Sequence, residues 1–228
     1  MSLIKKILIG VGALILVVLV GLFFFLGSIV KAGIQTVGPK VTKTSVSVSM
    51  VTLSPLTGGG RIRGLVIGNP PGFKSEFAVR MKDFRIKIVP RSLMKNVIVV
   101  RSISIEGPEI TKEGNNLETI QRNVQSFLPE DTGETKKSSK KIVVDDLWIK
   151  KAKVHLEVLG KMTTITIPDI HLTGIGRDSG GATPAQVVDK ALGSILSGVT
   201  AGVKNLGKSV TDQAEKVGSG LKDLLKKK

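Results

Sequence analysis

FAVRMKDFRIKI, residues 77 to 88, alternates apolar and charged side chains over most of its length. Arg or Lys separates most neighbouring apolar positions, which are Phe77, Val79, Met81, Phe84, Ile86 and Ile88. A period of two residues predicts a β-strand with one apolar face and one basic, solvated face. The apolar positions change from odd to even numbers across Asp83. We therefore expect a β-bulge or kink near Asp83.

The segments on both sides of this strand predict further strands of one sheet. Residues 45–53 alternate Ser with apolar side chains, and residues 61–68 form a second strand after a turn rich in glycine. Residues 97–105 continue the pattern after a turn at 90–96, and residues 142–175 predict two or three more strands. The apolar pattern of a sheet thus extends over most of the chain after residue 41.

Two other kinds of segment interrupt the strands. Residues 115–128 predict an amphipathic helix, in which Asn115 caps the first turn and Glu118 completes a capping box. Its apolar positions are Leu117, Ile120, Val124 and Phe127. The polar run that follows, residues 129–141, is predicted to be a flexible linker.

The N-terminal segment is the most apolar part of the chain. Lys5 and Lys6 precede an uncharged run from Ile7 to Val30. As a helix this run reaches roughly 36 Å, which exceeds the thickness of about 30 Å of a bilayer's hydrocarbon core. It predicts a transmembrane anchor over residues 7–30. A cleaved signal peptide is the alternative, although its apolar core is shorter and ends at a small-residue cleavage site. The flanking lysines favour residues 1–6 in the cytoplasm and the body outside.

The net charge of +16 and the absence of cysteine limit the classes of partner. Basic proteins bind nucleic acid, but an anchored chain with no tyrosine and a single tryptophan, Trp148, offers few platforms for stacking bases. Anionic lipid head groups match the charge better. Part of the charge serves solubility alone. We expect a membrane lipid and no nucleic acid as partner.

No catalytic or metal-binding pattern stands out. His155 and His171 lie in strand patterns, without neighbouring ligands at metal-binding spacing. Asp145, Asp146 and Asp189 lack a partner at catalytic spacing. The glycines at 58–60 precede a strand, whereas a phosphate-binding loop precedes a helix. The sequence predicts a protein that is not an enzyme and holds no cofactor or metal.

Several turn motifs at fixed spacing carry a family resemblance. After the apolar anchor come Gly68-Asn-Pro-Pro-Gly-Phe73, then Ser102-Ile-Ser-Ile-Glu-Gly-Pro-Glu109, and then Gly114-Asn-Asn-Leu117 at the start of a helix. This order resembles the N-terminal unit of the AsmA-like family, over residues 1–128 and more loosely over 142–175. The resemblance implies a bacterial inner-membrane protein with a periplasmic body, associated with lipid movement and outer-membrane homeostasis.

The resemblance also implies the fold, which is an α+β domain over residues 31–175 with a curved antiparallel sheet forming an open groove or half-barrel. The side chains expected to face this apolar groove are Val79, Met81, Phe84, Ile86, Ile88, Ile103 and Ile105. Family members proposed to bridge two membranes carry many more strands. About seven strands at 4.8 Å spacing give a sheet only about 34 Å wide, so this chain alone cannot span an envelope.

The C-terminal segment, residues 183–228, predicts one long amphipathic helix with Thr183 as its cap and Pro184 in its first turn. Apolar side chains recur in steps of 4, 3 and 4, an eleven-residue period. After Val188 the stripe comprises Leu192, Ile195, Val199, Val203, Leu206, Val210, Val217 and Leu221. Six glycines interrupt it and cost about 5 kcal/mol of helix propensity. The helix therefore needs a surface, which is its own sheet, a membrane or a second copy.

Two functions follow from these features. One is a lipid-handling protein whose apolar groove contributes to transport or envelope homeostasis. The other is an anchored adaptor or assembly factor, whose sheet is closed by its own helix and which binds a protein partner in the envelope. An uncovered apolar concavity favours the first, and a filled core favours the second. The sequence leaves the lipid, the partner and the oligomeric state open.

Overall fold

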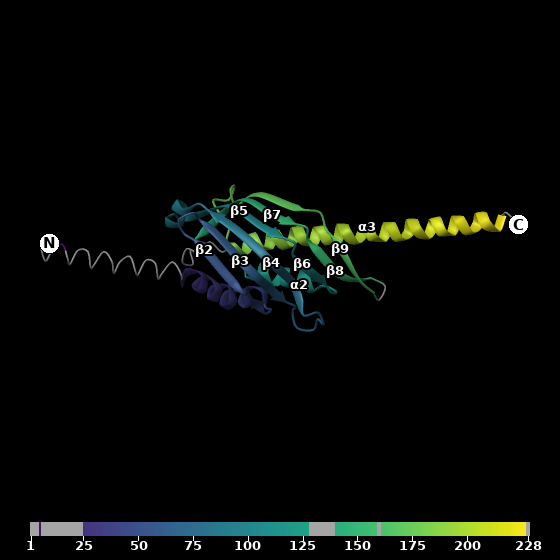
Figure 1. Ribbon diagram of the computed structural model, residues 1–228, viewed down its shortest axis with the longest axis horizontal. Helices are drawn as coiled ribbons and strands as arrows, with labels where there is room; N and C mark the ends of the chain where they lie inside the picture. Colours follow the sequence, from purple (N-terminus) through teal and green to yellow (C-terminus); the bar gives the residue numbers. More distant parts are fainter. Residues whose placement is uncertain (1–4, 6–24, 128–139, 159–160, 227–228) are drawn as a thin grey trace.

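A computed structural model describes residue 5 and residues 25–127, 140–158 and 161–226 (Figure 1). Residues 25–42 are helical. The strands and helices that follow are β1 (Val46–Ser47), β2 (Met50–Ser54), β3 (Gly59–Gly68), β4 (Phe77–Ile88), the 3-10 helix η1 (Pro90–Met94), β5 (Val97–Glu106), β6 (Glu109–Lys112), α2 (Asn116–Ser126), β7 (Lys141–Lys150), β8 (Lys153–Val158), β9 (Lys161–Thr166), β10 (Ile170–Ile175) and α3 (Pro184–Lys226).

Two of the expected segments fall largely outside the described residues. The anchor over residues 7–30 has only its last six residues, 25–30, in the described part, where they begin the helix 25–42. Within the described ranges, no helix combines the length and the apolar character needed to cross a membrane. The linker 129–141 lies outside as far as residue 139, and its last residue, Lys141, is the first residue of β7.

The described strands form one open, mixed sheet. Its central order is β10, β7, β5 and β4, and β3 then pairs β4 to β1 and β2. Most neighbours are antiparallel, as expected, but β5 with β7 and β6 with β8 are parallel. The expectation of a wholly antiparallel sheet is therefore wrong. Parallel neighbours need a crossover connection, and the segment containing α2 provides it between β6 and β7.

Several of the short strands join end to end into longer ones. β4 pairs Asp83 with Glu106 of β5 and Arg80 with Glu109 of β6, so β5 and β6 form one strand interrupted at residues 107 and 108. β7 and β8 keep the same offset to β5 and β6, with their interruption at residues 151 and 152. β9 and β10 are likewise interrupted between residues 166 and 170. These interruptions lie side by side across the sheet.

The same alignment explains the change of apolar phase at Asp83. The register between β3 and β4 runs through Asp83 unchanged, and its shift comes at Ile67/Gly68; the shift between β4 and β5 comes at Lys87/Ile88. Of the bulge or kink expected near Asp83, the bulge is therefore absent from both registers at that residue. Neighbouring strands change phase at the same level, where Gly64 (φ 61°) and Gly107 (φ 56°) adopt left-handed backbone conformations. A change shared by neighbours leaves the pairing in register.

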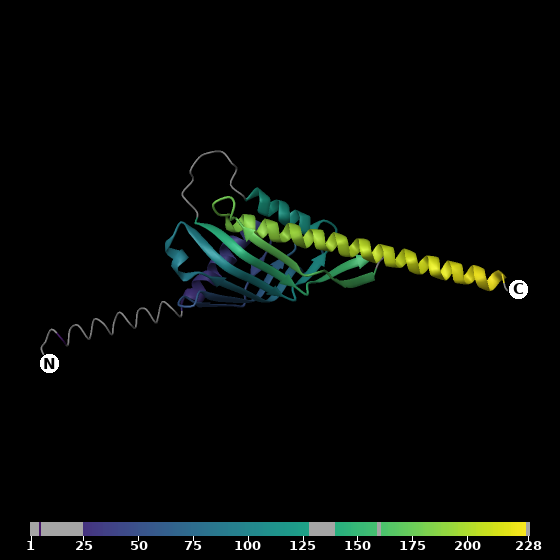
Figure 2. The same cartoon turned by 90° about the horizontal axis from the view of Figure 1, so that it is seen from above.

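The helices lie on the apolar face of the sheet, and the core fills the space between them (Figure 2). Buried side chains come from the sheet, from α2 through Leu117, Ile120 and Val124, and from α3. The helix 25–42 lies beside β1, where Gly38 faces the side chain of Val46. Asn123 of α2 donates to the carbonyl of Thr42 at 2.8 Å, which ties this helix to α2.

α3 begins as the sequence predicts and packs on the sheet. The amide of Gln186 donates to the Thr183 hydroxyl at 3.2 Å, while the Thr183 amide donates to the Gln186 side chain at 2.7 Å. This pair is a capping box. Leu192, Ile195 and Val199 are buried. The sequence left three surfaces open for this helix: the protein's own sheet, a membrane or a second copy. The first half of α3 packs on the protein's own sheet.

Candidate functional site

The apolar face of the sheet is built from rows of side chains that run from strand to strand. Phe84 of β4 lies opposite Ile62 of β3 and Ile105 of β5. The pairings of β2, β7 and β10 extend this row to six strands: Val51, Ile62, Phe84, Ile105, Ile149 and Ile170. Alternating side chains on paired strands produce such a row whenever every register agrees.

A second row lies two residues further along β4. Ile86 faces Gly60 of β3 and Ile103 of β5. The full row is Leu53, Gly60, Ile86, Ile103, Leu147 and Leu172. A Cβ on Gly60 would lie 2.7 Å from Cγ2 of Ile86, so glycine is the residue that lets Ile86 occupy this position. Both rows are continuous apolar bands across the sheet.

The two rows are covered unequally. Their members on β5 and β7, namely Ile103, Ile105, Leu147 and Ile149, are buried. Their members on β2, β3 and β4 are half-buried, as is Ile88 at the end of β4. We call this half-buried set the β2–β4 patch: Val51, Leu53, Ile62, Phe84, Ile86 and Ile88. Ile170 and Leu172, their members on β10 at the other edge, are half-buried as well. α3 approaches the sheet most closely near β9, where Gly198 and Gly202 face Ile167 and Ile165.

The side chains expected in a groove divide between the core and this patch. Val79, Ile103 and Ile105 are buried in the core, whereas Met81, Phe84, Ile86 and Ile88 are half-buried. Val51, Leu53 and Ile62 belong to the same patch but were not among the expected groove residues. The alternation of residues 45–53 contains the signal for the first two, since Thr52 separates them. That these three side chains lie beside those of β4 depends on the order of the strands, which local alternation does not specify.

The apolar stripe of α3 is covered only in part. Leu192, Ile195 and Val199 are buried, but Val188 and Val203 are exposed, Val203 to 40%. The side chains of Leu206, Val210, Val217 and Leu221 lie outside those described. The helix leaves the sheet after Gly202 and projects beyond β9 in both views (Figures 1 and 2). Residues 203–226 extend roughly 36 Å at about 1.5 Å per residue.

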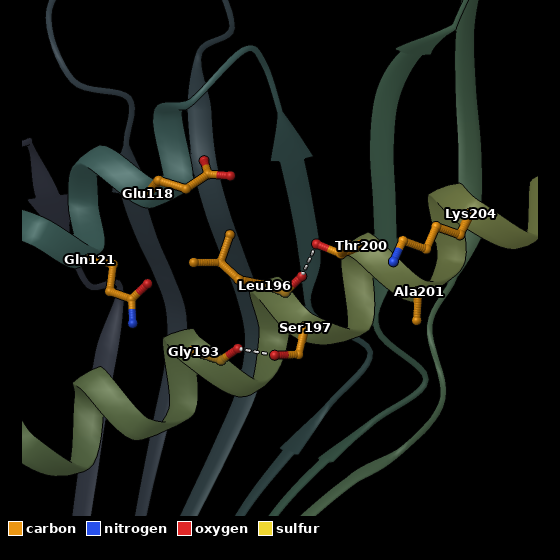
Figure 3. Close-up of a pocket in the computed structure, with 8 residues that line it drawn as sticks. All are labelled: Glu118, Gln121, Gly193, Leu196, Ser197, Thr200, Ala201 and Lys204. Carbon is orange, nitrogen blue, oxygen red and sulfur yellow. Dashed lines mark hydrogen bonds between the residues drawn. The ribbon is translucent and has the colours of Figure 1, made fainter. Parts of the chain in front are cut away.

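A groove of about 590 Å³ runs between α2 and α3 (Figure 3). Glu118 and Gln121 line it from α2, and Gly193, Leu196, Ser197, Thr200, Ala201 and Lys204 line it from α3. The hydroxyls of Ser197 and Thr200 donate to carbonyls of their own helix at 3.0 and 2.9 Å. Glu118 pairs with Lys112 at 2.5 Å. Most of the polar groups in this groove are thus engaged within the protein.

The opposite face of the sheet is charged and paired. Arg61 and Arg85 flank Asp83 and donate to its carboxylate. The hydrogen bond from Arg61 is the main reason why the pKa of Asp83 lies below its usual value. Lys82 in the same way lowers the pKa of Glu109, to which it donates at 3.1 Å. These pairs agree with the basic solvent face that the alternation of residues 77–88 predicts.

The two histidines lie on this charged face. His171 stacks on Trp148 with ring centroids 3.7 Å apart and hydrogen-bonds Asp146 at 2.8 Å. His155 hydrogen-bonds Thr164 at 2.9 Å. Within the ranges that the structure covers, no three His, Cys, Asp or Glu side chains gather as metal ligands would. Each histidine bonds a side chain of the neighbouring strand, His155 from β8 to β9 and His171 from β10 to β7.

Two of the three motifs that carry the family resemblance, residues 68–73 and 114–117, meet in space. Asn116 donates to the side chain of Asn69 and to the carbonyl of Thr111, both at 2.7 Å. Comparison of the chain with protein-family models, curated proteins and solved structures gives no match in any of the three. The resemblance to the AsmA-like family consequently stays a prediction.

Proposed function

We propose that this protein is a membrane-anchored, non-catalytic protein of the bacterial cell envelope whose β2–β4 patch binds the acyl chains of lipids. The unequal cover of the apolar rows carries this proposal. The same two bands that are buried on β5 and β7 continue, half-buried, on β2, β3 and β4. A sheet face left partly open to solvent in this way offers apolar area to a ligand.

The chemistry of the patch favours an acyl chain. Its members are aliphatic or aromatic, and they continue directly into the buried core through Ile103 and Ile105. An acyl chain needs no hydrogen-bonding partner and gains about 0.8 kcal/mol for each CH₂ that it buries. The N-terminal apolar run would hold the body close to a bilayer that supplies such chains. The inner membrane and a periplasmic body are part of this proposal.

A photoreactive fatty acid incorporated into membranes that contain the full chain tests this function. Crosslinked peptides should map to β2, β3 and β4, and Ile86→Gln should lower their yield because it places an amide on the patch. Lys87→Gln is the matched control, since the neighbouring side chain lies on the charged face. Crosslinks that avoid β2–β4, or that Ile86→Gln leaves unchanged, would exclude the patch as a lipid site.

The projecting part of α3 favours a second function, that of an anchored adaptor. Val203 is exposed just where the helix leaves the sheet, and the helix continues to Lys226. A photo-crosslinking amino acid at position 203 should give adducts with one discrete envelope protein. The same amino acid at Thr200, exposed where the helix still lies over the sheet, is the control. Equal adduct patterns at the two positions would argue against an adaptor helix.

A further inference from the structure

Two neighbouring turns at one end of the sheet carry exposed apolar side chains. Leu56, between β2 and β3, is 86% exposed, and Met94 of η1, between β4 and β5, is 92% exposed. Leu93 beside it is also exposed. The amide of Ile88 donates to the carbonyl of Gly58 at 2.8 Å, which holds the two turns together. We call Leu56, Leu93 and Met94 the apolar tip.

Cationic side chains surround this tip. Arg91 and Lys95 flank Leu93 and Met94 and are exposed, as are Lys140 and Lys141 at the start of β7. Lys140 Nζ donates to the Leu93 carbonyl at 2.6 Å, and the amide of Lys141 donates to the Asn96 carbonyl at 3.2 Å. Residues 55–58 and 89–96 contain no Asp or Glu. The nearby loop after β10 adds Arg177, paired with Asp145 at 2.6 Å, and the exposed Asp178.

The first described residues of the helix 25–42 lie at this same end of the molecule. Gly27 lies against the carbonyl of Val51 and Gly38 against Val46, so the helix runs antiparallel to β1 and β2 and its start points toward the turn after Ser54. Both views place η1 and this helix start at one end and the end of α3 at the other (Figures 1 and 2). Phe25, at the start of the helix, is 67% exposed.

We propose that the apolar tip docks on the lipid surface of the membrane that the N-terminal segment enters, with Leu56 and Met94 in the interfacial layer and the surrounding cations on anionic head groups. This inference rests on the proposed membrane anchor. The uncharged run upstream of residue 25 brings the tip to a bilayer, because it joins the body at the tip's own end. The docked tip fixes the long axis of the molecule away from the membrane, with α3 pointing outward.

The chemistry of the tip fits a lipid surface. Isolated large apolar side chains on turns, ringed by Lys and Arg, insert shallowly among head groups while each cation gains attraction to anionic lipid. A protein partner would instead need a continuous area of at least about 1,000 Å² with matched polar groups. The tip consists of three separate side chains on two turns.

The absence of cysteine makes a direct test feasible. The full chain carrying Met94→Cys is labelled with a fluorophore and reconstituted into vesicles of phosphatidylcholine and phosphatidylglycerol that contain a head-group quencher. We expect quenching and a blue-shifted emission at position 94. Met162→Cys is the matched control, because Met162 is 68% exposed on β9 at the far end of the sheet. Its label should be neither quenched nor shifted.

Charge reversal tests the cations separately. A Leu56→Cys label should be quenched less when Arg91→Glu and Lys95→Glu are present, and also less in vesicles of phosphatidylcholine alone. A label at position 94 that stays unquenched while the chain sediments with the vesicles overturns docking but leaves the anchor intact. A disulfide between two chains of the unlabelled Met94→Cys variant, together with no quenching of the labelled one, would assign the tip to self-association and overturn the proposal. Failure of the chain to remain with the vesicles would refute the anchor instead.

Discussion

Asn116 joins parts of the chain that lie far apart in sequence. Its side chain is fully buried, donates to Asn69 and Thr111, and accepts from the amides of Glu113 and Leu117. The sequence predicts Asn115 as the cap of α2, yet the Asn115 side chain makes no capping bond and Glu118 pairs with Lys112. The neighbouring asparagine takes the structural role because it alone points into the turn formed by residues 69–75.

Replacing Asn116 by Ala should destabilise the fold strongly. The substitution leaves Asn69 and the Thr111 carbonyl without their donor in a buried site, and each such loss costs about 1–3 kcal/mol. We expect the free energy of unfolding in urea to fall by about 3 kcal/mol. Asn115→Ala is the control, since the Asn115 side chain is exposed. Equal losses for the two variants would contradict the role of Asn116.

Glu113 should give the fold part of its acid sensitivity. The Ser75 hydroxyl at 2.6 Å and the amides of Lys74 and Ser75 at 2.8 Å donate to its carboxylate and lower its pKa from the usual value of 4.5. A lowered pKa in the folded state stabilises the fold above pH 4.5, and this contribution disappears as the pH falls through the folded-state value. Urea midpoints of wild type should therefore decrease below pH 4.5.

The Glu113→Gln variant isolates this contribution. Its midpoint should be lower than wild type at neutral pH and should approach it in acid, because the lost bonds are those that protonation also weakens. Glu76→Gln is the control, since Glu76 is exposed and its ion pair to Arg80 spans 3.7 Å. A constant difference between Glu113→Gln and wild type across the acid range would show that the Glu113 charge is not responsible.

At the scale of the element, the glycines of α3 are packing positions as well as weak points of the helix. A Cβ on Gly202 would lie 2.7 Å from Cδ1 of Ile165, and one on Gly198 would lie 3.1 Å from Cδ1 of Ile167. The eleven-residue period predicts the stripe correctly at Leu192, Ile195 and Val199. It treats Gly198 and Gly202 only as losses of propensity, because periodicity contains no information on how closely a helix approaches its neighbour.

Substitution of these glycines by leucine should separate packing from propensity. Gly198→Leu should destabilise the fold by about 1–3 kcal/mol, because its side chain overpacks the contact with Ile167. Gly207→Leu should be neutral or raise helicity, since a Cβ at Gly207 would meet nothing within 4 Å. Thermal unfolding followed by circular dichroism measures both. If both variants gained stability, α3 would not be packed as closely on β9 as the structure has it.

In the strands, too, some features follow from the local sequence pattern and others depend on pairing with distant segments. Alternation within residues 77–88 predicts the extent and facing of β4, and the phase change at Asp83 is a real feature of that strand. Of the two interpretations, a bulge or a kink, the bulge was wrong because neighbouring strands change phase at the same level, at Gly64 and at residues 107 and 108. Local alternation likewise does not predict that β5 and β7 pair in parallel, because this pairing depends on the crossover through α2.

At the scale of the whole molecule, the two halves of α3 differ in what they contact. Its first half closes the core, and its second half, from residue 203, projects away from the end where the helix 25–42 begins (Figure 1). The sequence predicts the helix and its apolar stripe but leaves open which surface it covers. It also predicts half of the β2–β4 patch, namely the β4 side chains, because only the strand order places Val51, Leu53 and Ile62 beside them.

Two truncations should therefore behave differently. A chain ending at residue 203 should keep its fold and its unfolding midpoint, because Leu192, Ile195 and Val199 all lie in the part that remains. A chain ending at Thr183 loses these three buried side chains. At about 2–5 kcal/mol each, their loss removes most of a typical stability of 5–15 kcal/mol, so this chain should aggregate or bind hydrophobic dyes.

The same pair of truncations discriminates between the proposed functions. If the β2–β4 patch binds acyl chains, the chain ending at residue 203 should crosslink a photoreactive fatty acid as wild type does, because the patch lies on strands that this truncation leaves untouched. If the projecting helix is an adaptor, the same chain should lose its adducts with the envelope partner while its urea midpoint stays unchanged. Loss of fatty-acid crosslinking without loss of stability would instead place the lipid on the projecting helix and exclude the patch.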